Sequence, residues 1–170
     1  MKKLQLCILA IIIPVVSIFS SCEKNIFEKE FVPRQFFSIH MTTDKEGTVF
    51  EADVICSSYE DIKIAFTSPQ ELSGFSVETN GDSYSINAFG VPDELKSNEI
   101  KDTSLLNVLI RSIKLAVFTN HGTFTETENG VTATVTAESV NVDIVFDKEG
   151  YITSLKAPDI GFSAEFQNQG

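Results

Sequence analysis

The residue whose type and position point most clearly to chemistry is Cys22, which follows a pair of serines near the start of the chain. A lysine pair precedes it, and the apolar run at residues 4–18 is long enough for the core of an export signal but short for a stable membrane span. A cysteine at the end of such a signal offers a thiol for lipid attachment. The pattern therefore predicts a lipoprotein signal at residues 1–21, followed by Cys22 acylated with chains such as palmitate.

The segment Phe19-Ser20-Ser21-Cys22 resembles a bacterial lipobox, but a large aliphatic residue usually stands where this chain has Phe19. An ordinary secretory signal cut near Ser21, or a simple N-terminal anchor, remains an alternative. Glu23 is compatible with sorting to the outer membrane, because enterobacterial lipoproteins retained in the inner membrane usually have an aspartate there. We expect a lipid-anchored protein of the bacterial cell envelope, at the outer membrane.

The cysteines leave no pair for an intramolecular disulfide in the expected mature chain. Cys7 leaves with the signal and Cys22 carries lipid, so that only Cys56 remains. Cys56 ends the alternating run Phe50-Ala52-Val54-Cys56, where a free cysteine behaves as a small buried hydrophobe. The alternative is a reactive thiol, which the sequence disfavours because no basic residue flanks Cys56 to lower its pKa.

Other residues that could do chemistry lack a supporting pattern. The two histidines, His40 and His121, have no metal-ligand spacing, and no phosphate-binding glycine loop or nucleophile elbow is present. Carboxylate pairs occur at Asp143 and Asp147 and at Glu126 and Glu128, but alternation places them on a solvated strand face. We predict that the protein is not an enzyme and uses no metal or cofactor.

Length and charge limit the domain count and the partners. Removal of residues 1–21 from the 170-residue chain leaves 149 residues, enough for one domain with a core. Loss of two of the 13 basic residues leaves 11 against 24 acidic ones, a net charge of −13, which argues against nucleic acid as a partner. Residues 22–35 are predicted to be a lipid-anchored charged linker and residues 36–170 a single antiparallel β domain.

Apolar residues alternate with polar ones through most of the domain, which is typical of strands with one buried face. The turn pairs Glu46-Gly47, Asn80-Gly81, Asn129-Gly130 and Glu149-Gly150 fall where strands must reverse. The alternating segments are Phe37-Ile39-Met41, Phe50-Ala52-Val54-Cys56, Ile62-Ile64-Phe66, Phe75-Val77, Tyr84-Ile86-Ala88, Val131-Ala133-Val135-Ala137, Val140-Val142-Ile144-Phe146 and Ile160-Phe162-Ala164-Phe166. Strands joined in this way form an antiparallel sheet covered on one side.

One segment, residues 103–118, is predicted to be a long helix that covers the sheet. Its polar residues Asn107, Arg111 and Lys114 share a narrow sector, and nearly everything else around the helix is apolar. Asp102 is a plausible cap, and a pair of strands is the alternative because valine and isoleucine are frequent. The fold class that we expect is α+β, mainly β, with a curved antiparallel sheet and one long apolar helix on its concave face.

Two shorter segments are predicted to form single helical turns. Ser68-Pro69-Gln70-Glu71-Leu72-Ser73-Gly74 has capping-box spacing between Ser68 and Glu71 and a terminal glycine. The segment Val91-Pro92-Asp93-Glu94-Leu95 is predicted to be a similar element before the long helix.

This order of elements, with the Ser-Pro-x-x-Leu-x-Gly turn, an apolar helix and four final strands, resembles the LolA/LolB-like half-barrel lipoprotein superfamily, which includes bacterial lipoprotein carriers and related lipid-binding lipoproteins. The resemblance covers Phe36 to Phe166. It implies a half-barrel that binds acyl chains or other lipids between the sheet and its helix. The residues expected to line that cleft are Phe50, Phe66, Phe75, Leu105, Leu109, Ile113 and Phe146.

The fourteen phenylalanines of the chain are compatible with two different interiors. Bulky rings on a curved face either line an apolar slot or fill a solid core. The first interior predicts a protein that binds a lipid or hydrophobic ligand. The second predicts a non-enzymatic structural lipoprotein that acts on an envelope protein partner through its sheet face or an edge strand. A hydrolase that uses His40 or His121 is the third hypothesis.

Overall fold

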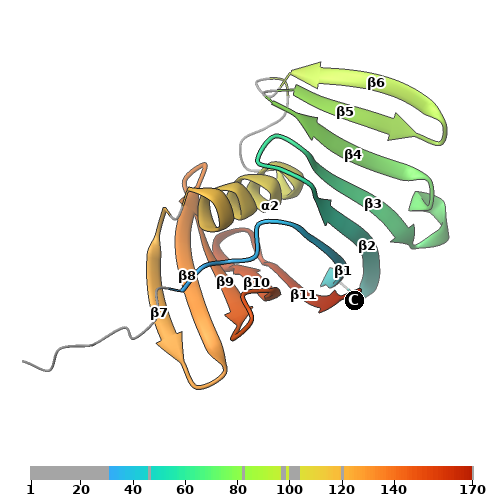
Figure 1. Ribbon diagram of the computed structural model, residues 1–170. Helices are drawn as coiled ribbons and strands as arrows, with labels where there is room; N and C mark the ends of the chain where they lie inside the picture. The colour runs from blue at the N-terminus through green and yellow to red at the C-terminus, as the bar shows by residue number, and fades with distance from the viewer. Residues whose placement is uncertain are drawn as a thin grey trace, which may run out of the picture. The chain divides into compact units, whose positions relative to one another are not determined.

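The alternating segments form eleven strands of one antiparallel sheet in the part of the chain that the structure describes (Figure 1). The computed structural model describes residues 31–45, 47–81, 83–96, 99, 104–119 and 121–169, so the signal and Cys22 lie outside the described residues. The strands are β1 (Phe37–Lys45), β2 (Thr48–Cys56), β3 (Ile62–Ser68), β4 (Phe75–Asn80), β5 (Ser83–Ala88), β6 (Val91–Lys96), β7 (Thr123–Thr127), β8 (Gly130–Ala137), β9 (Val140–Asp147), β10 (Ile152–Ala157) and β11 (Phe162–Asn168).

The strand order explains why the sheet stays open. Strands β1 to β6 follow one another toward one edge, and β11 back to β7 follow one another toward the other. The two arms join where β1 pairs with β11 in the middle of the sheet. Strands β6 and β7 are therefore the two edges, and the sheet is curved but not closed into a barrel.

The register places apolar side chains on one continuous face. In the first arm Val54 lies opposite both Ile39 and Ile64, and Ile64 lies opposite Val77. In the second arm Ile144 lies opposite Ala133 and Leu155. Because alternate residues of a strand point to opposite sides, this register collects the buried residues of both arms into one core and confirms the predicted one-sided sheet.

Three strands were missed by the sequence patterns, and one of them corrects a predicted helical turn. Residues 91–95 belong to strand β6, because positive φ angles at Phe89 and Gly90 turn the chain back onto β5. Strands β7 and β10 have little apolar alternation and were also missed. The predicted turn near Pro69 is confirmed as the 3₁₀ turn η1 (Gln70–Leu72), although no side chain caps it.

The helical segment is shorter than predicted. The helix α2 (Leu105–Ile113) continues into the π-helical turn η3 (Lys114–Phe118), and both together are shorter than the predicted span of residues 103–118. The physical reason is the cap: the Ser104 side chain accepts a hydrogen bond from the Asn107 amide at 3.2 Å, so the first helical residue is Leu105. The predicted cap, Asp102, lies outside the described residues.

The compact unit begins at Phe31, within the stretch that the sequence assigned to the linker. Residues 31–36 have no regular secondary structure, yet the half-buried Phe31 packs against the core. The short turn η4 (Pro158–Ile160) connects β10 to β11, so the last strand begins at Phe162 and not at Ile160.

Cys56 lies at the end of β2 with 2% of its surface exposed, which confirms the predicted buried position. Burial raises the pKa of its thiol from 9.0 to about 12, and the Asp61 carboxylate acts in the same direction. The Ser58 carbonyl, which accepts a hydrogen bond from the thiol, and Lys114 oppose this shift.

We expect Cys56 to resist alkylation in the folded protein. At about pH 8, iodoacetamide should label it at least about 1000 times more slowly than in urea, because three pKa units separate the two thiols and only the thiolate reacts. The folded state also holds this proton more tightly, so its stability should fall as the pH rises from about 9 toward 12. Mass spectrometry of labelled protein checks the rate, and the variant Cys56→Ala should lose this part of the pH dependence. Rapid labelling in native buffer would contradict the buried position.

Candidate ligand-binding surface

The seven residues predicted to line a cleft lie in three different settings. Leu109, Ile113 and Phe146 are fully buried members of the core. Phe50, Phe66 and Phe75 are half-buried, whereas Leu105 is exposed at the start of the helix. The structure brings together Phe66 and Phe75, whose ring centroids are 5.8 Å apart in a tilted arrangement.

The ring pair belongs to a row of apolar residues that runs across the arm from β3 to β6. Phe75 lies opposite Ala88, and Ala88 lies opposite Val91. One step along the strands, Val77 lies opposite Ile86. We call the half-buried or exposed members of this surface the open wing, which consists of Phe66, Phe75, Ile86, Ala88 and Val91.

The open wing is continuous with the core but is not covered as the core is. The helix α2 and the turn η3 pack chiefly against β8, and α2 also packs against β9. Figure 1 shows β4, β5 and β6 extending beyond the helix. As a result Val91 is 67% exposed, and Phe89 in the adjoining turn is 64% exposed. Contiguous apolar surface that is left uncovered is a general feature of interaction sites.

A cleft of about 420 Å³ lies where the helix faces three turns of the sheet, and its lining residue Tyr84 stands two residues before Ile86 of the open wing on β5. Arg111 and Lys114 of the helical segment line one wall. The Arg111 side chain bonds the Glu138 carboxylate at 2.7 Å, and the Lys114 ammonium lies 5.1 Å from the centre of the Tyr59 ring. The cleft is lined by Tyr59, Glu60, Gly81, Tyr84, Ile110, Arg111, Lys114, Leu115, Thr136, Ala137 and Glu138.

Tyr84, which lines this cleft, belongs to a buried polar pair. The Tyr84 hydroxyl on β5 donates a hydrogen bond of 2.8 Å to the side-chain carbonyl of Asn107 on the helix. Burial raises the pKa of Tyr84; the charge of Arg111 lowers this pKa by a smaller amount, and the charge of Glu138 raises it further. The neutral hydroxyl therefore remains a hydrogen-bond donor at physiological pH and ties the helix to the first arm of the sheet.

Sequence reasoning missed Tyr84 and Asn107 as partners. Tyr84 was placed in an alternating strand and Asn107 in the polar sector of the helix, but neither position indicates which element packs on which. Asn107 is buried, so its place in the predicted polar sector does not make it a surface residue. The polar sector of the helix was the signal for Asn107 and the apolar row of β5 the signal for Tyr84, but their pairing needed the tertiary structure.

The histidines lie apart from this cleft. His40 on β1 and Asp53 on β2 are cross-strand neighbours, with the His40 Nδ1 2.9 Å from the carboxylate of Asp53. The Gln169 amide donates a 2.6 Å hydrogen bond to the same carboxylate oxygen. His121 is exposed in the turn before β7. The structure therefore brings neither histidine into the cleft beside the helix.

The carboxylates named in the sequence analysis either form hydrogen bonds within the sheet and its turns or are exposed. Asp147 accepts hydrogen bonds from the backbone amides of Glu149 and Tyr151 and so shapes the β9–β10 turn. Asp143 accepts one from the Thr134 hydroxyl across the β8–β9 pair. Glu126 and Glu128 are exposed. Among the described residues, no group of histidine, cysteine and carboxylate side chains has an arrangement suited to a metal ion.

In the part of the chain that the structure describes, no helix has the length and hydropathy needed to cross a bilayer. The predicted signal and acylation site at Cys22 lie outside that part.

Comparison with known proteins gives a distant likeness in fold. No protein-family model matches the chain, and no curated protein matches it. Among solved structures, a LolA superfamily protein from Nitrosomonas europaea is similar, with a TM-score of 0.42 and 10% sequence identity. The match covers 74% of this chain and 66% of that chain. The likeness to this superfamily is distant and is one of fold alone.

Proposed function

We propose that this protein binds a lipid or another hydrophobic ligand on the apolar face of its sheet, with the open wing as the contact surface. The observation that carries the proposal is the exposure of Val91 on a row of apolar residues that continues directly into the core. A row across β3, β4, β5 and β6 is about 14 Å long at the usual strand spacing. Each methylene that such a surface buries contributes about 0.8 kcal/mol, so a single acyl chain suffices for measurable binding.

The proposal includes the placement of the helix. We infer that α2 lies on the concave side of the curved sheet, since Val108, Ile110 and Ile113 belong to the same buried cluster as the inward residues of the strands. The helix then closes one part of the apolar face and leaves the open wing free. The cleft beside it adds Arg111 and Lys114, which suit a polar or charged end of a ligand whose chain lies on the wing.

The proposal also includes a lipid anchor at Cys22 in the bacterial cell envelope, at the outer membrane. Such an anchor keeps the open wing close to membrane lipids without a spanning helix. Mass spectrometry of the mature N-terminus tests this part separately, and an unmodified Cys22 would remove the anchor while leaving ligand binding untouched. With a net charge of −11 for the chain, we expect no nucleic acid partner and propose no catalytic step.

A second candidate function is a structural or protein-interaction role in the envelope. Phe89 and Val91 form an exposed apolar pair at the corner of the sheet, next to the edge strand β6, and Leu109 and Ile113 are packed as in a filled core. A protein partner that covers this corner would use the same residues as a lipid. The two candidates differ in whether the purified protein alone binds acyl chains.

The variant Val91→Asp tests the ligand-binding proposal. Its side chain is on the open wing and largely exposed, so a carboxylate there leaves the fold intact but opposes burial under an acyl chain. We expect wild-type protein to bind a fluorescent long-chain fatty acid and Val91→Asp to bind it at least about tenfold more weakly, a loss of about 1.4 kcal/mol. Fluorescence titration measures both affinities.

Val49→Asp is the matched control, because Val49 is also an exposed strand valine but lies on the opposite face of the sheet, across from Asp44. This variant should bind like wild type. Equal affinities for all three proteins would place the binding elsewhere, and no binding by wild type would favour the protein-interaction candidate.

A further inference from the structure

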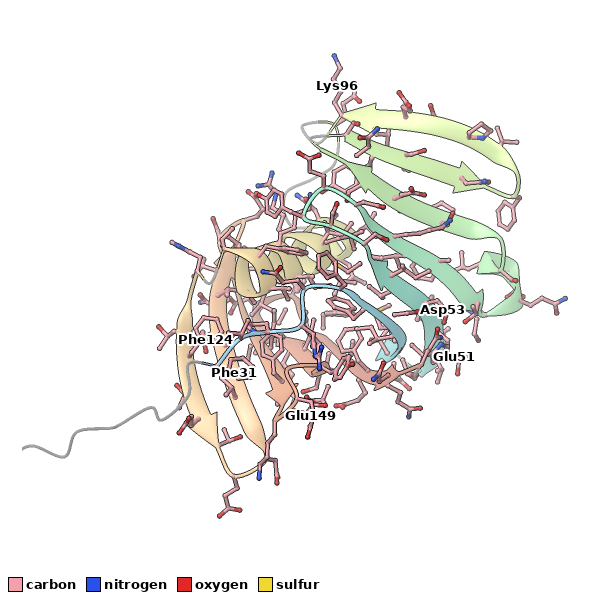
Figure 2. The ribbon with its side chains drawn as sticks, viewed as in Figure 1. Phe31, Glu51, Asp53, Lys96, Phe124 and Glu149 are labelled. Atoms are coloured by element: carbon pink, nitrogen blue, oxygen red, sulfur yellow. The ribbon has the colours of Figure 1, made fainter. Side chains whose placement is uncertain are left out.

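The first described residues of the chain place an aromatic ring on the core at the other end of the sheet. The Phe31 ring packs edge-on against Phe146 of β9, with centroids 5.5 Å apart, and tilts against Phe124 of β7 at 6.4 Å. Figure 2 shows Phe31 beside Phe124, with the chain from Phe31 running toward β1. We call residues 31–36 the strap, and its Phe31 covers a ring, Phe146, that is itself 0% exposed.

A few individual contacts hold the strap. The Arg34 amide donates a 2.9 Å hydrogen bond to the Gly150 carbonyl, and its Nε donates one of 3.3 Å to the Glu149 carbonyl. The Arg34 guanidinium also lies 5.4 Å from the centre of the Tyr151 ring. The backbones approach closely at Gly150, where a Cβ would come within 2.9 Å of the Val32 carbonyl oxygen.

The strap is held less firmly than a strand of the sheet. It does not join the hydrogen-bond ladder of the sheet, and Val32 and Phe36 are each 66% exposed. Exposed hydrogen bonds and a single cation–π contact each contribute only about 1 kcal/mol or less. The half-buried Phe31 and the buried Pro33 therefore supply much of the attraction, and a competing apolar group can replace the Phe31 ring at its position.

We propose that Phe31 occupies a second acyl-chain position on the same apolar face, between Phe124 and Phe146, and that a bound acyl chain displaces the strap. The strap is then an intramolecular competitor for ligand. This inference rests on the proposed function only for the chemical class of the ligand. The position itself comes from the contacts of the Phe31 ring, which fills it in the free protein. It adds a site at β7–β9 that is separate from the open wing at β3–β6.

The first measurement uses wild-type protein and hydrogen exchange. In the free protein the Arg34 amide is bonded to the Gly150 carbonyl and should exchange slowly. Saturation with a long-chain fatty acid should speed exchange at Arg34 at least about fivefold, while exchange in β9 slows or stays the same. Slower or unchanged exchange at Arg34 in the saturated protein would overturn the displacement.

The second measurement compares variants of the strap. Phe31→Ala frees the position between Phe124 and Phe146, and Gly150→Ala displaces the strap by crowding the Val32 carbonyl. Both should gain an additional fatty-acid site in a titration, or bind at least about fivefold more tightly. Phe36→Ala, which truncates an exposed aromatic residue of the same strap, is the matched control and should behave like wild type.

A core variant tests whether any new cavity, and not only removal of the strap, creates a fatty-acid site. Ile62 is a fully buried residue of β3, far from the strap in sequence, and its truncation to alanine opens space in the core. Ile62→Ala should gain no fatty-acid site. A similar gain in Ile62→Ala and Phe31→Ala would overturn the proposal. Combining Phe31→Ala with Val91→Asp keeps the two proposals distinct, because loss of binding on the open wing leaves the gain at the strap position measurable.

Discussion

Gly130→Ala is expected to cost more than about 3 kcal/mol of unfolding free energy, or to prevent folding. Gly130 is the first residue of β8 and has a φ of +155°. A Cβ at this position would overlap the carbonyl oxygen of Phe146 on β9, which is backbone and has no room to move within the ladder. Urea unfolding followed by circular dichroism measures the change.

Gly47→Ala is the control for Gly130→Ala. Gly47 lies in the β1–β2 turn with a φ of +82°, which also disfavours alanine, but a Cβ would meet no atom within 4 Å. We expect a loss of about 1 kcal/mol from the strained backbone alone. If Gly130→Ala were no more destabilising than Gly47→Ala, the close approach of β8 to the Phe146 backbone would be wrong.

Phe146→Ala is expected to destabilise the protein by about 3–5 kcal/mol, the usual range for removing a buried phenylalanine. Phe146 is 0% exposed and lies opposite both Val131 and Ile152 in the neighbouring strands. Its loss opens a cavity and also removes the ring against which Phe31 packs. Urea unfolding at neutral pH gives the difference.

Phe89→Ala provides the comparison, since it deletes the same ring from a turn residue that is 64% exposed. Its unfolding free energy should stay within about 0.5 kcal/mol of wild type. The double variant Phe31→Ala/Phe146→Ala adds a further check, because residues in contact are not additive and the second truncation should cost less than it does alone. Full additivity would contradict the contact between the two rings.

Much of the fold could be predicted because each strand carries its own signal. Alternation at Ile62-Ile64 and Val140-Val142-Ile144 marks a strand locally, and the glycine pairs mark where it turns. Strand β6 could not be predicted in this way: Val91, Pro92 and Asp93 are exposed at an edge, so burial imposed no period-two pattern on them. Edge strands such as β7 lack the signal for the same reason.

The candidate site was less predictable than the fold. Alternation placed Phe66, Phe75 and Phe146 on the apolar face, but every one of them satisfies that pattern equally well whether it is covered or open. The strap was assigned to the linker because its charged neighbours and Pro33 dominate the composition of that segment. Only the packing of Phe31 shows that the domain begins earlier.

The sequence by itself determined that the sheet is antiparallel, that one face is apolar and that Cys56 is buried, because these properties depend on neighbouring residues and a period of two. The tertiary structure decided that β1 pairs with β11, that the helix packs against β8 and β9, and that the open wing stays uncovered. Those outcomes depend on contacts between residues far apart in the chain, such as Tyr84 with Asn107 and Phe31 with Phe146. Local patterns carry no information about such partners, because many apolar surfaces of similar size satisfy the same hydrophobic driving force.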